Sequence, residues 1–316
     1  MIEGAIFGPL DADDIVDALE AACERSLRSS LRDGFLYEVS AGVVIGCELV
    51  DGRQVIVKGY QPRWTTTFLA AVKRVQSFLH AADFPCPRPL DGAMRVGAAV
   101  MLAESVLPDP GVGPANAGSR GLLAVGLAEL VERCRHLDEP GLAEHPLRRP
   151  FHGAFPEPHS PIFDFAATRD GAEWIEDLAL RAREVVDADT SRPVIAHTDW
   201  SLRNVRIDDV GVVGVFDWDS LALLRESEAV ALAAATWSKT GQPNDPTPTS
   251  TDIDLYADAY EARRGRQLTT VQRRAMHAAA IASMAYTARC EHAIDPHEQT
   301  WTTTRPRLRE AAAAIT

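Results

Sequence analysis

The chain has 316 residues, and its 45 acidic and 32 basic side chains give a formal charge of −13 at pH 7. With 46% hydrophobic and 24% charged residues it has the composition of a folded globular protein, which excludes wholesale disorder. The acidic surplus argues against nucleic acid and anionic membranes as partners and favours cationic small molecules.

The five cysteines are widely spaced and form no CxxC pair, so neither a disulfide framework nor a structural zinc site is indicated. The first residues lack a basic segment followed by an apolar one, and no run reaches the roughly 18 to 20 apolar residues of a membrane span. We therefore expect a cytoplasmic protein.

Residues 1–107 are expected to form a small lobe, a sheet with one packed helix. Apolar residues at helical spacing, alternating β-rich runs and an Asp51-Gly52 turn mark its elements. These are a helix at 11–29, antiparallel strands within 35–60, a helix from about 65 that stops before the prolines of 84–90, and strands at 93–97 and 99–106.

Residues 108–316 are expected to form a larger, mainly helical lobe that begins with a Pro/Gly-rich linker at 108–121. The expected elements are helices at 122–137 and 172–187, a loop at 140–163, three short β-rich runs between 194 and 217, and helices from 226 onwards, interrupted by a loop at 238–252. The two lobes together predict an α+β fold.

The segment 197–220, HTDWSLRNVRIDDVGVVGVFDWDS, carries the most chemical information. Asp199 and Asn204 follow one apolar strand, and Asp217 ends another. The two β-runs between Asn204 and Asp217, joined by a turn at 208–211, predict a hairpin, which brings its ends together. A carboxylate that is free to act as a base would then lie near two oxygen ligands of the kind that Mg²⁺ prefers.

The pattern HxDxxxxN followed by a hairpin and an aspartate resembles the catalytic and metal-binding loops of the protein-kinase-like phosphotransferases. HTDWSLRN with VFDWDS is most similar to the aminoglycoside phosphotransferase and choline kinase branch, and the resemblance covers nearly the whole chain. It implies a bilobal fold with an antiparallel-sheet N-lobe and a helical C-lobe.

The resemblance also implies roles for individual residues. Asp199 would accept or position the proton of the attacking hydroxyl, Asn204 and Asp217 would hold Mg²⁺, and Lys58 would contact the α- and β-phosphates of ATP, with GTP as an open alternative. Lys58 is one of only three lysines, beside 29 arginines.

The glycine-rich segment SAGVVIG departs from the family pattern. Gly42 and Gly46 are candidates to close over the phosphates through backbone N–H groups, but the segment is not GxGxxG, and a bulged strand explains it nearly as well.

A second departure lies in the helix that follows Lys58. Protein kinases pair this lysine with a helix glutamate, yet residues 64–82 contain no acidic side chain. Gln76 or a carboxylate elsewhere would have to substitute. Thr198 also replaces a glycine that is common in this branch, and we expect it to be tolerated.

Several neighbouring residues have two interpretations. Arg203 and Arg206 face the γ-phosphate or are ordinary surface arginines, and the second is slightly favoured. His197 is assigned to bracing the loop rather than to proton relay, and Asp219 to capping rather than to a second metal. Trp200 and Trp218 are expected to pack in the interior.

The acceptor would bind in the second lobe, where most of the acidic excess lies. Six carboxylates are candidates to line a cleft for a polycationic amino sugar, although a solvated face is the more frequent explanation of such a group. They are Glu226, Glu228, Asp252, Asp254, Asp258 and Glu261.

The sequence thus predicts an ATP-dependent phosphotransferase that acts on a hydroxyl of a small, cationic acceptor, such as an aminoglycoside or related antibiotic, in antibiotic resistance. A kinase of a metabolic amino alcohol, sugar or amino sugar is the first alternative. A nucleotide-binding pseudokinase that regulates a partner is the second, favoured by the missing helix carboxylate. A metalloprotein using His292 and His297 is a poor third, because their spacing fits no helical ligand pair.

Overall fold

The computed structural model describes residues 2–90, 92–96, 99–148, 153–160, 162–242, 245–297 and 304–312. It divides into two compact units, one of Met1–Pro108 with His159–Pro161 and one of Asp109–Pro158 with Ile162–Thr316. Parts of the loops predicted at 140–163 and 238–252 lie outside the described residues. Among the described helices, none is long and apolar enough to cross a bilayer.

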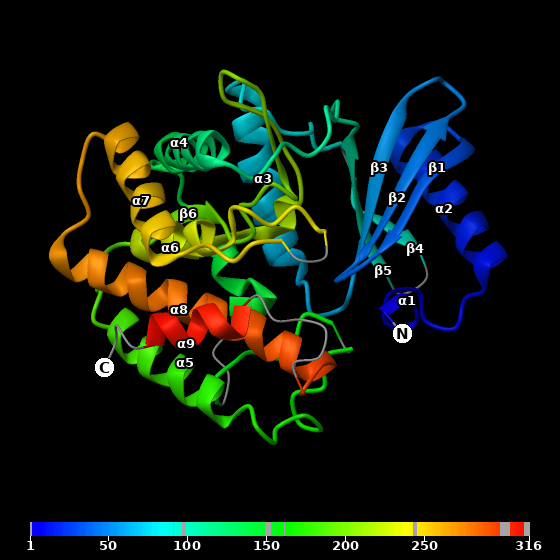
Figure 1. Cartoon of the computed structure of the whole chain (residues 1–316). Helices are drawn as coiled ribbons and strands as arrows, with labels where there is room; N and C mark the ends of the chain where they lie inside the picture. Colours follow the sequence, from blue (N-terminus) through cyan, green and yellow to red (C-terminus); the bar gives the residue numbers. More distant parts are fainter. Residues whose placement is uncertain are drawn as a thin grey trace. The chain divides into compact units, whose positions relative to one another are not determined.

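The first unit is built on one antiparallel sheet with the strand order β1-β2-β3-β5-β4 (Figure 1). Its elements are α1 (Ile2–Phe7), α2 (Ala12–Leu27), β1 (Leu31–Val39), β2 (Val43–Leu49), β3 (Gln54–Tyr60), α3 (Thr66–Ala81), β4 (Met94–Val96) and β5 (Ala99–Ser105). The predicted order is confirmed, and α1 is an addition, because six residues are too few to show a helical period in sequence.

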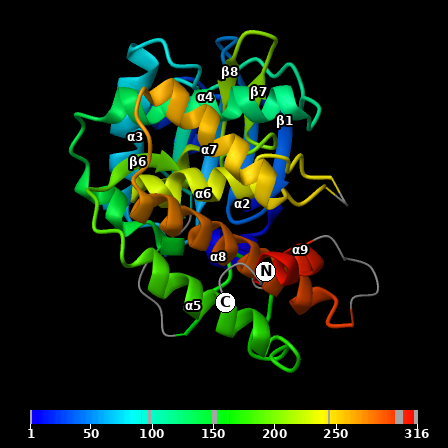
Figure 2. The same ribbon diagram turned by 60° about the vertical axis from the view of Figure 1, so that its left-hand side comes forward.

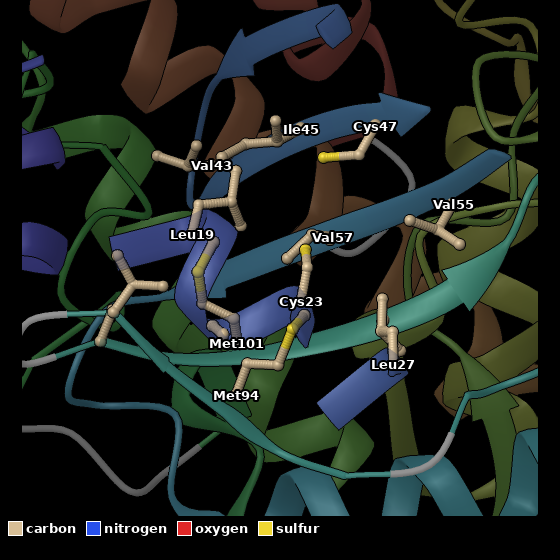
Figure 3. Packing of buried hydrophobic residues seen from close by; sticks show 14 of the residues in the cluster. Leu19, Cys23, Leu27, Val43, Ile45, Cys47, Val55, Val57, Met94 and Met101 are labelled. Carbon is tan, nitrogen blue, oxygen red and sulfur yellow. The ribbon is translucent and has the colours of Figure 1, made fainter. Parts of the chain in front are cut away.

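The two faces of this sheet differ because successive strand side chains alternate between them. Val55 and Val57 point into a buried cluster with Leu19, Cys23 and Leu27 of α2, and Figure 3 shows these side chains gathered between the helix and the strands. Residues of β3 with even numbers, including Lys58, therefore point to the opposite face.

The second unit is mainly helical, with two small two-stranded sheets, β6 with β9 and β7 with β8. Its α-helices are α4 (Ala117–Cys134), α5 (Glu173–Val186), α6 (Glu226–Thr236), α7 (Ser250–Arg264), α8 (Thr270–Ile294) and α9 (Thr304–Ala312). Its strands are β6 (Val194–His197), β7 (Val205–Ile207), β8 (Val212–Val215) and β9 (Leu221–Leu224), and its 3₁₀ turns are η1 (Pro140–Glu144), η2 (Pro146–Arg148) and η3 (Trp218–Ser220). Helix α8 packs against α5, α6 and α9 (Figure 2).

Helix α4 begins five residues earlier than predicted, inside the expected linker. The side chain of Asn116 accepts a hydrogen bond from the N–H of Ser119 and caps the helix. Farther along, Gly126 lies against Trp200 and Val212, where an added Cβ would come within 3.1 Å of the Trp200 ring. The missing side chain therefore lets α4 approach the loop after β6 and the β7–β8 hairpin.

Candidate active site

The loop that follows β6 is held by an amide from its own far end. Nδ2 of Asn204 donates to Oδ2 of Asp199 at 2.7 Å and to the carbonyl oxygen of Asp199 at 3.1 Å. Asp199 is half-buried. Within the described part of the chain, no hydrogen bond reaches its other oxygen, Oδ1. The carboxylate is therefore fixed on one side and available to a ligand on the other.

The β7–β8 hairpin brings Asn204 next to the segment that carries Asp217. Val205 pairs with Val215, and the N–H of Phe216 donates to the carbonyl oxygen of Asn204 at 2.8 Å. The turn closes as the sequence predicts, because the Asp208 carboxylate accepts hydrogen bonds from two backbone N–H groups of the turn. The ends of the hairpin are therefore neighbours.

Asp217 has a left-handed backbone conformation, with φ 59° and ψ 49°. Residues other than glycine rarely adopt this backbone conformation, and those that do are frequent at active sites and ligand-binding sites. The hydroxyl of Ser220 donates to Oδ2 of Asp217 at 2.8 Å. This bond fixes the carboxylate just past the end of the hairpin.

His197 links the two loops instead of facing outward. Its ring is fully buried. Nδ1 accepts from the N–H of Asp199 at 3.2 Å, and Nε2 then carries the proton that is donated to the carbonyl oxygen of Phe216 at 3.0 Å. Thr198 adds two more bonds, from its N–H and its hydroxyl to the carbonyl oxygen of Ser220. These contacts fit the bracing role predicted for His197.

The donor set of Asn204 and Asp217 fits a hard divalent cation. Nδ2 of Asn204 is engaged with Asp199, which leaves its amide oxygen for a ligand. One amide oxygen and one carboxylate are few ligands for Ca²⁺ but suit Mg²⁺ completed by phosphate oxygens. No group of three His, Cys, Asp or Glu side chains that could hold a metal occurs within the described residues.

Lys58 is buried in the first unit, with about 9% of its surface exposed. Its Nζ forms an ion pair with Oε1 of Glu104 at 3.2 Å, and Nε2 of Gln76 donates to Oε2 of the same carboxylate at 2.9 Å. Both substitutes considered from the sequence are thus present. The carboxylate comes from β5, so Lys58 has an anionic partner although the helix lacks the acidic residue whose absence favoured a pseudokinase.

The two candidate glycines differ in their surroundings. Gly42 lies in the β1–β2 turn, where a Cβ would meet the carbonyl oxygen of Gly59 at 2.7 Å. Gly46 lies inside β2, paired with Leu36 on one side and Ile56 on the other, beneath the Phe35 ring at an irregularity of β1. A position in a central strand, opposite the irregularity of β1, favours the strand interpretation for Gly46 over a role in phosphate binding.

The arginine interpretation requires a correction. Arg206 is buried rather than exposed. Its Nε and Nη2 contact the two oxygens of Asp109 at 2.6 and 3.0 Å, and its guanidinium lies over the Phe216 ring. The hydrogen bond from Arg206 lowers the pKa of Asp109. Arg203 is exposed, as the surface interpretation predicts.

The two tryptophans pack as expected. Trp200 and Trp218 are almost fully buried, and their indole N–H groups donate to the carbonyl oxygens of Leu123 and Val215. Asp219 lies in the first turn of η3 and is half-buried.

The six acidic residues proposed for a cationic acceptor are instead paired with basic side chains. Glu226 is buried and contacts Arg264, Arg266 and the Tyr260 hydroxyl. Arg273 forms ion pairs with Asp254, Asp258 and Glu261. Asp252 pairs with Arg120, and Glu228 with Arg225. Each of the six carboxylates therefore has a basic partner in the second unit, which weakens their support for a cationic acceptor, and the exposure of Asp254 and Asp258 agrees with the solvated face that the sequence favoured.

His292 is buried, and its Nε2 lies 3.0 Å from the carbonyl oxygen of Asp170. His297 is exposed. Neither belongs to a metal-binding group among the residues that the structure describes, so the metalloprotein alternative gains no support.

Residues 47–266 match the model of the phosphotransferase enzyme family. No curated protein matches the chain. Similar solved structures include amicoumacin kinase hAmiN in complex with AMP-PNP, Ca²⁺ and Ami, with 10% identity over 89% of this chain and 87% of that one and a TM-score of 0.61. A microcompartment-associated aminopropanol kinase has 14% identity over 96% and 94%, with a TM-score of 0.58. A putative fructosamine-3-kinase from Thermobifida fusca has 15% identity over 95% and 99%, with a TM-score of 0.54. At these identities the likeness establishes the fold, which is protein-kinase-like.

Proposed function

The chain belongs to the phosphotransferase enzyme family, and from that premise we propose that it transfers the γ-phosphate of ATP to a hydroxyl group of a small cationic acceptor. The observation that carries the proposal is the convergence of Asp199, Asn204 and Asp217 through one hairpin. Phosphoryl transfer requires alignment and charge neutralisation more than covalent chemistry, and these three groups supply both.

In this proposal Oδ1 of Asp199 accepts the hydrogen bond of the acceptor hydroxyl and takes its proton as the oxygen attacks. Asn204 holds Asp199 through its amide N–H and, with Asp217, presents oxygens to Mg²⁺. When bound, Mg²⁺ neutralises phosphate charge. The first unit contributes Lys58, whose ammonium contacts the α- and β-phosphates, and Gly42 in the turn over the nucleotide.

The net charge of −13 supports a cationic acceptor. The six carboxylates add little to that support, because each has a basic partner. An antibiotic such as an aminoglycoside remains our first candidate. A metabolic amino alcohol or amino sugar is the second, and the solved structures named for an aminopropanol kinase and a fructosamine kinase favour it.

The test is an acceptor screen that couples ADP release to product mass. Each amine-bearing acceptor is paired with its N-acetylated form, which keeps the hydroxyl and removes the charge. We expect turnover only with the free amines and none with Asp199→Ala. Equal turnover of both forms would exclude a cationic acceptor. Failure of every hydroxyl compound to accept phosphate, with Mg·ATP still raising Tm, would support a regulatory nucleotide-binding role instead.

A further inference from the structure

The register of β3 with β5 places Lys58 and Glu104 on one face of the sheet. Lys58 lies opposite Leu102, and Ile56 lies opposite Glu104, so Lys58 and Glu104 are diagonal neighbours. Their side chains are 11% and 9% exposed, and Nζ lies 3.2 Å from Oε1. Both members of the ion pair therefore belong to adjacent strands.

Helix α3 contributes only a neutral group to this pair. Nε2 of Gln76 donates to Oε2 of Glu104 at 2.9 Å and to the carbonyl oxygen of Pro87 at 3.0 Å. Gln76 is buried, and α3 carries no acidic residue from Thr66 to Ala81. Each oxygen of the Glu104 carboxylate thus has its own partner, the ammonium on one side and the amide on the other.

We infer that Glu104 is the positioning residue for Lys58, and that the sheet rather than α3 holds the phosphate-binding ammonium in place. The inference rests on the proposed function. Loss of Glu104 removes the anionic group that lies 3.2 Å from Nζ, so the lysine would change its position or its protonation. A shift of α3 would remove only the amide of Gln76 and leave the ion pair intact.

The first experiment compares the kinetics of E104Q, Q76L and the control E48Q, which removes a carboxylate of the same sheet that is about one-third exposed and pairs with Arg32. E104Q is expected to lower kcat/KM for ATP about a hundredfold, as misplacement of a reacting group by roughly 1 Å does. Q76L is expected to lose much less, and E48Q to match the wild type. Wild-type kinetics in E104Q, or an equal loss in Q76L, would overturn the inference.

The second experiment measures the chemical reactivity of Lys58 and does not require turnover. Because the chain has three lysines, acetylation by dilute acetic anhydride followed by peptide mass spectrometry resolves Lys58 from Lys73 and Lys239. In E104Q, Lys58 is expected to change its acetylation rate and lose protection by Mg·ATP, while Lys239 stays unchanged. An unchanged Lys58 would overturn the inference even if no acceptor is ever found.

If E104Q does not fold, E104D keeps the charge and shortens its reach. It is expected to fall between the wild type and complete loss in kcat/KM, and wild-type behaviour of E104D would also overturn the inference. Absence of ATP turnover and of a nucleotide-induced Tm shift in the wild type would contradict the proposed function alone, since the acetylation comparison still reports on Lys58.

Discussion

The N–H of Phe216 donates to the carbonyl oxygen of Asn204 at 2.8 Å. This bond is one of those that join the loop after β6 to the segment that carries Asp217, because Phe216 precedes Asp217 and Asn204 holds Asp199. Any proposal for catalysis by these groups depends on that connection.

Asp199→Asn is expected to reduce kcat by about 10² to 10⁴-fold, the range for loss of a general base. Nucleotide affinity should be largely kept, because the amide retains the shape of the carboxylate. Steady-state kinetics measures kcat, and the thermal shift with Mg·ATP reports nucleotide affinity. A variant that keeps wild-type kcat would exclude Asp199 as the base.

Asp217→Asn is expected to abolish Mg²⁺-dependent turnover, and it suits the site better than alanine, because asparagine tolerates the left-handed backbone. Asp208→Asn is the matched control, since Asp208 only closes the turn of the same hairpin. Titration of turnover with Mg²⁺ compares them. Equal Mg²⁺ dependence in both variants would remove Asp217 from the metal site.

His197→Phe should destabilise the protein by about 3 kcal/mol, because it removes two hydrogen bonds, one to the part-buried carbonyl oxygen of Phe216 and one from the N–H of Asp199. Urea unfolding gives the free energy. His136 is exposed, so His136→Phe should change stability little. A His197 variant that is stable yet inactive would instead favour a direct role in catalysis.

Gly126→Ala and Gly121→Ala test the approach of α4 to the hairpin. An added Cβ at Gly121 meets no atom within 4 Å, so alanine should stabilise the helix by about 0.5 to 1 kcal/mol. At Gly126 it meets Trp200 and Val212, and a loss of about 1 to 3 kcal/mol is expected. Thermal unfolding measures both. The same sign for both variants would contradict the close approach.

Glu291→Gln should change how stability depends on pH. Burial raises the pKa of Glu291, and one of its oxygens has no hydrogen-bond partner within the described residues. The folded state therefore binds more protons than the unfolded state between the ordinary and the raised pKa, and stability falls as pH rises through that window. The variant should gain Tm over the wild type as pH rises from about 4. A constant difference across pH would refute this.

Local sequence patterns predicted the hairpin and most elements, because turn chemistry and side-chain periods act over a few residues. The partners of Arg206 and Lys58 were not predictable in the same way. Asp109 and Glu104 are distant in sequence, and only strand register and tertiary packing bring them close. Once the 54–60 and 99–105 strands are paired, the two-residue period does place Glu104 beside Lys58.

The acidic residues of α7 agree only in part with the solvated face that the sequence favoured. Asp254 and Asp258 are about half exposed, whereas Glu261 is buried, and Arg273 from the next helix forms ion pairs with all three. Composition alone does not say which charges find partners. The glycines and prolines at 108–121 predicted a linker over the whole segment, although Asn116 caps α4, which begins inside it.

Within the described residues, Glu104 and Gln76, which hold Lys58 through an ion pair and a hydrogen bond, belong to the first unit, and Asn204 and Ser220, which hold Asp199 and Asp217, belong to the second. Compensating substitutions should follow the same division. In a selection for revertants, suppressors of a damaged Glu104 would cluster around β3, β5 and α3, and suppressors of a damaged His197 around the hairpin, so the epistasis map of this enzyme would separate into two blocks.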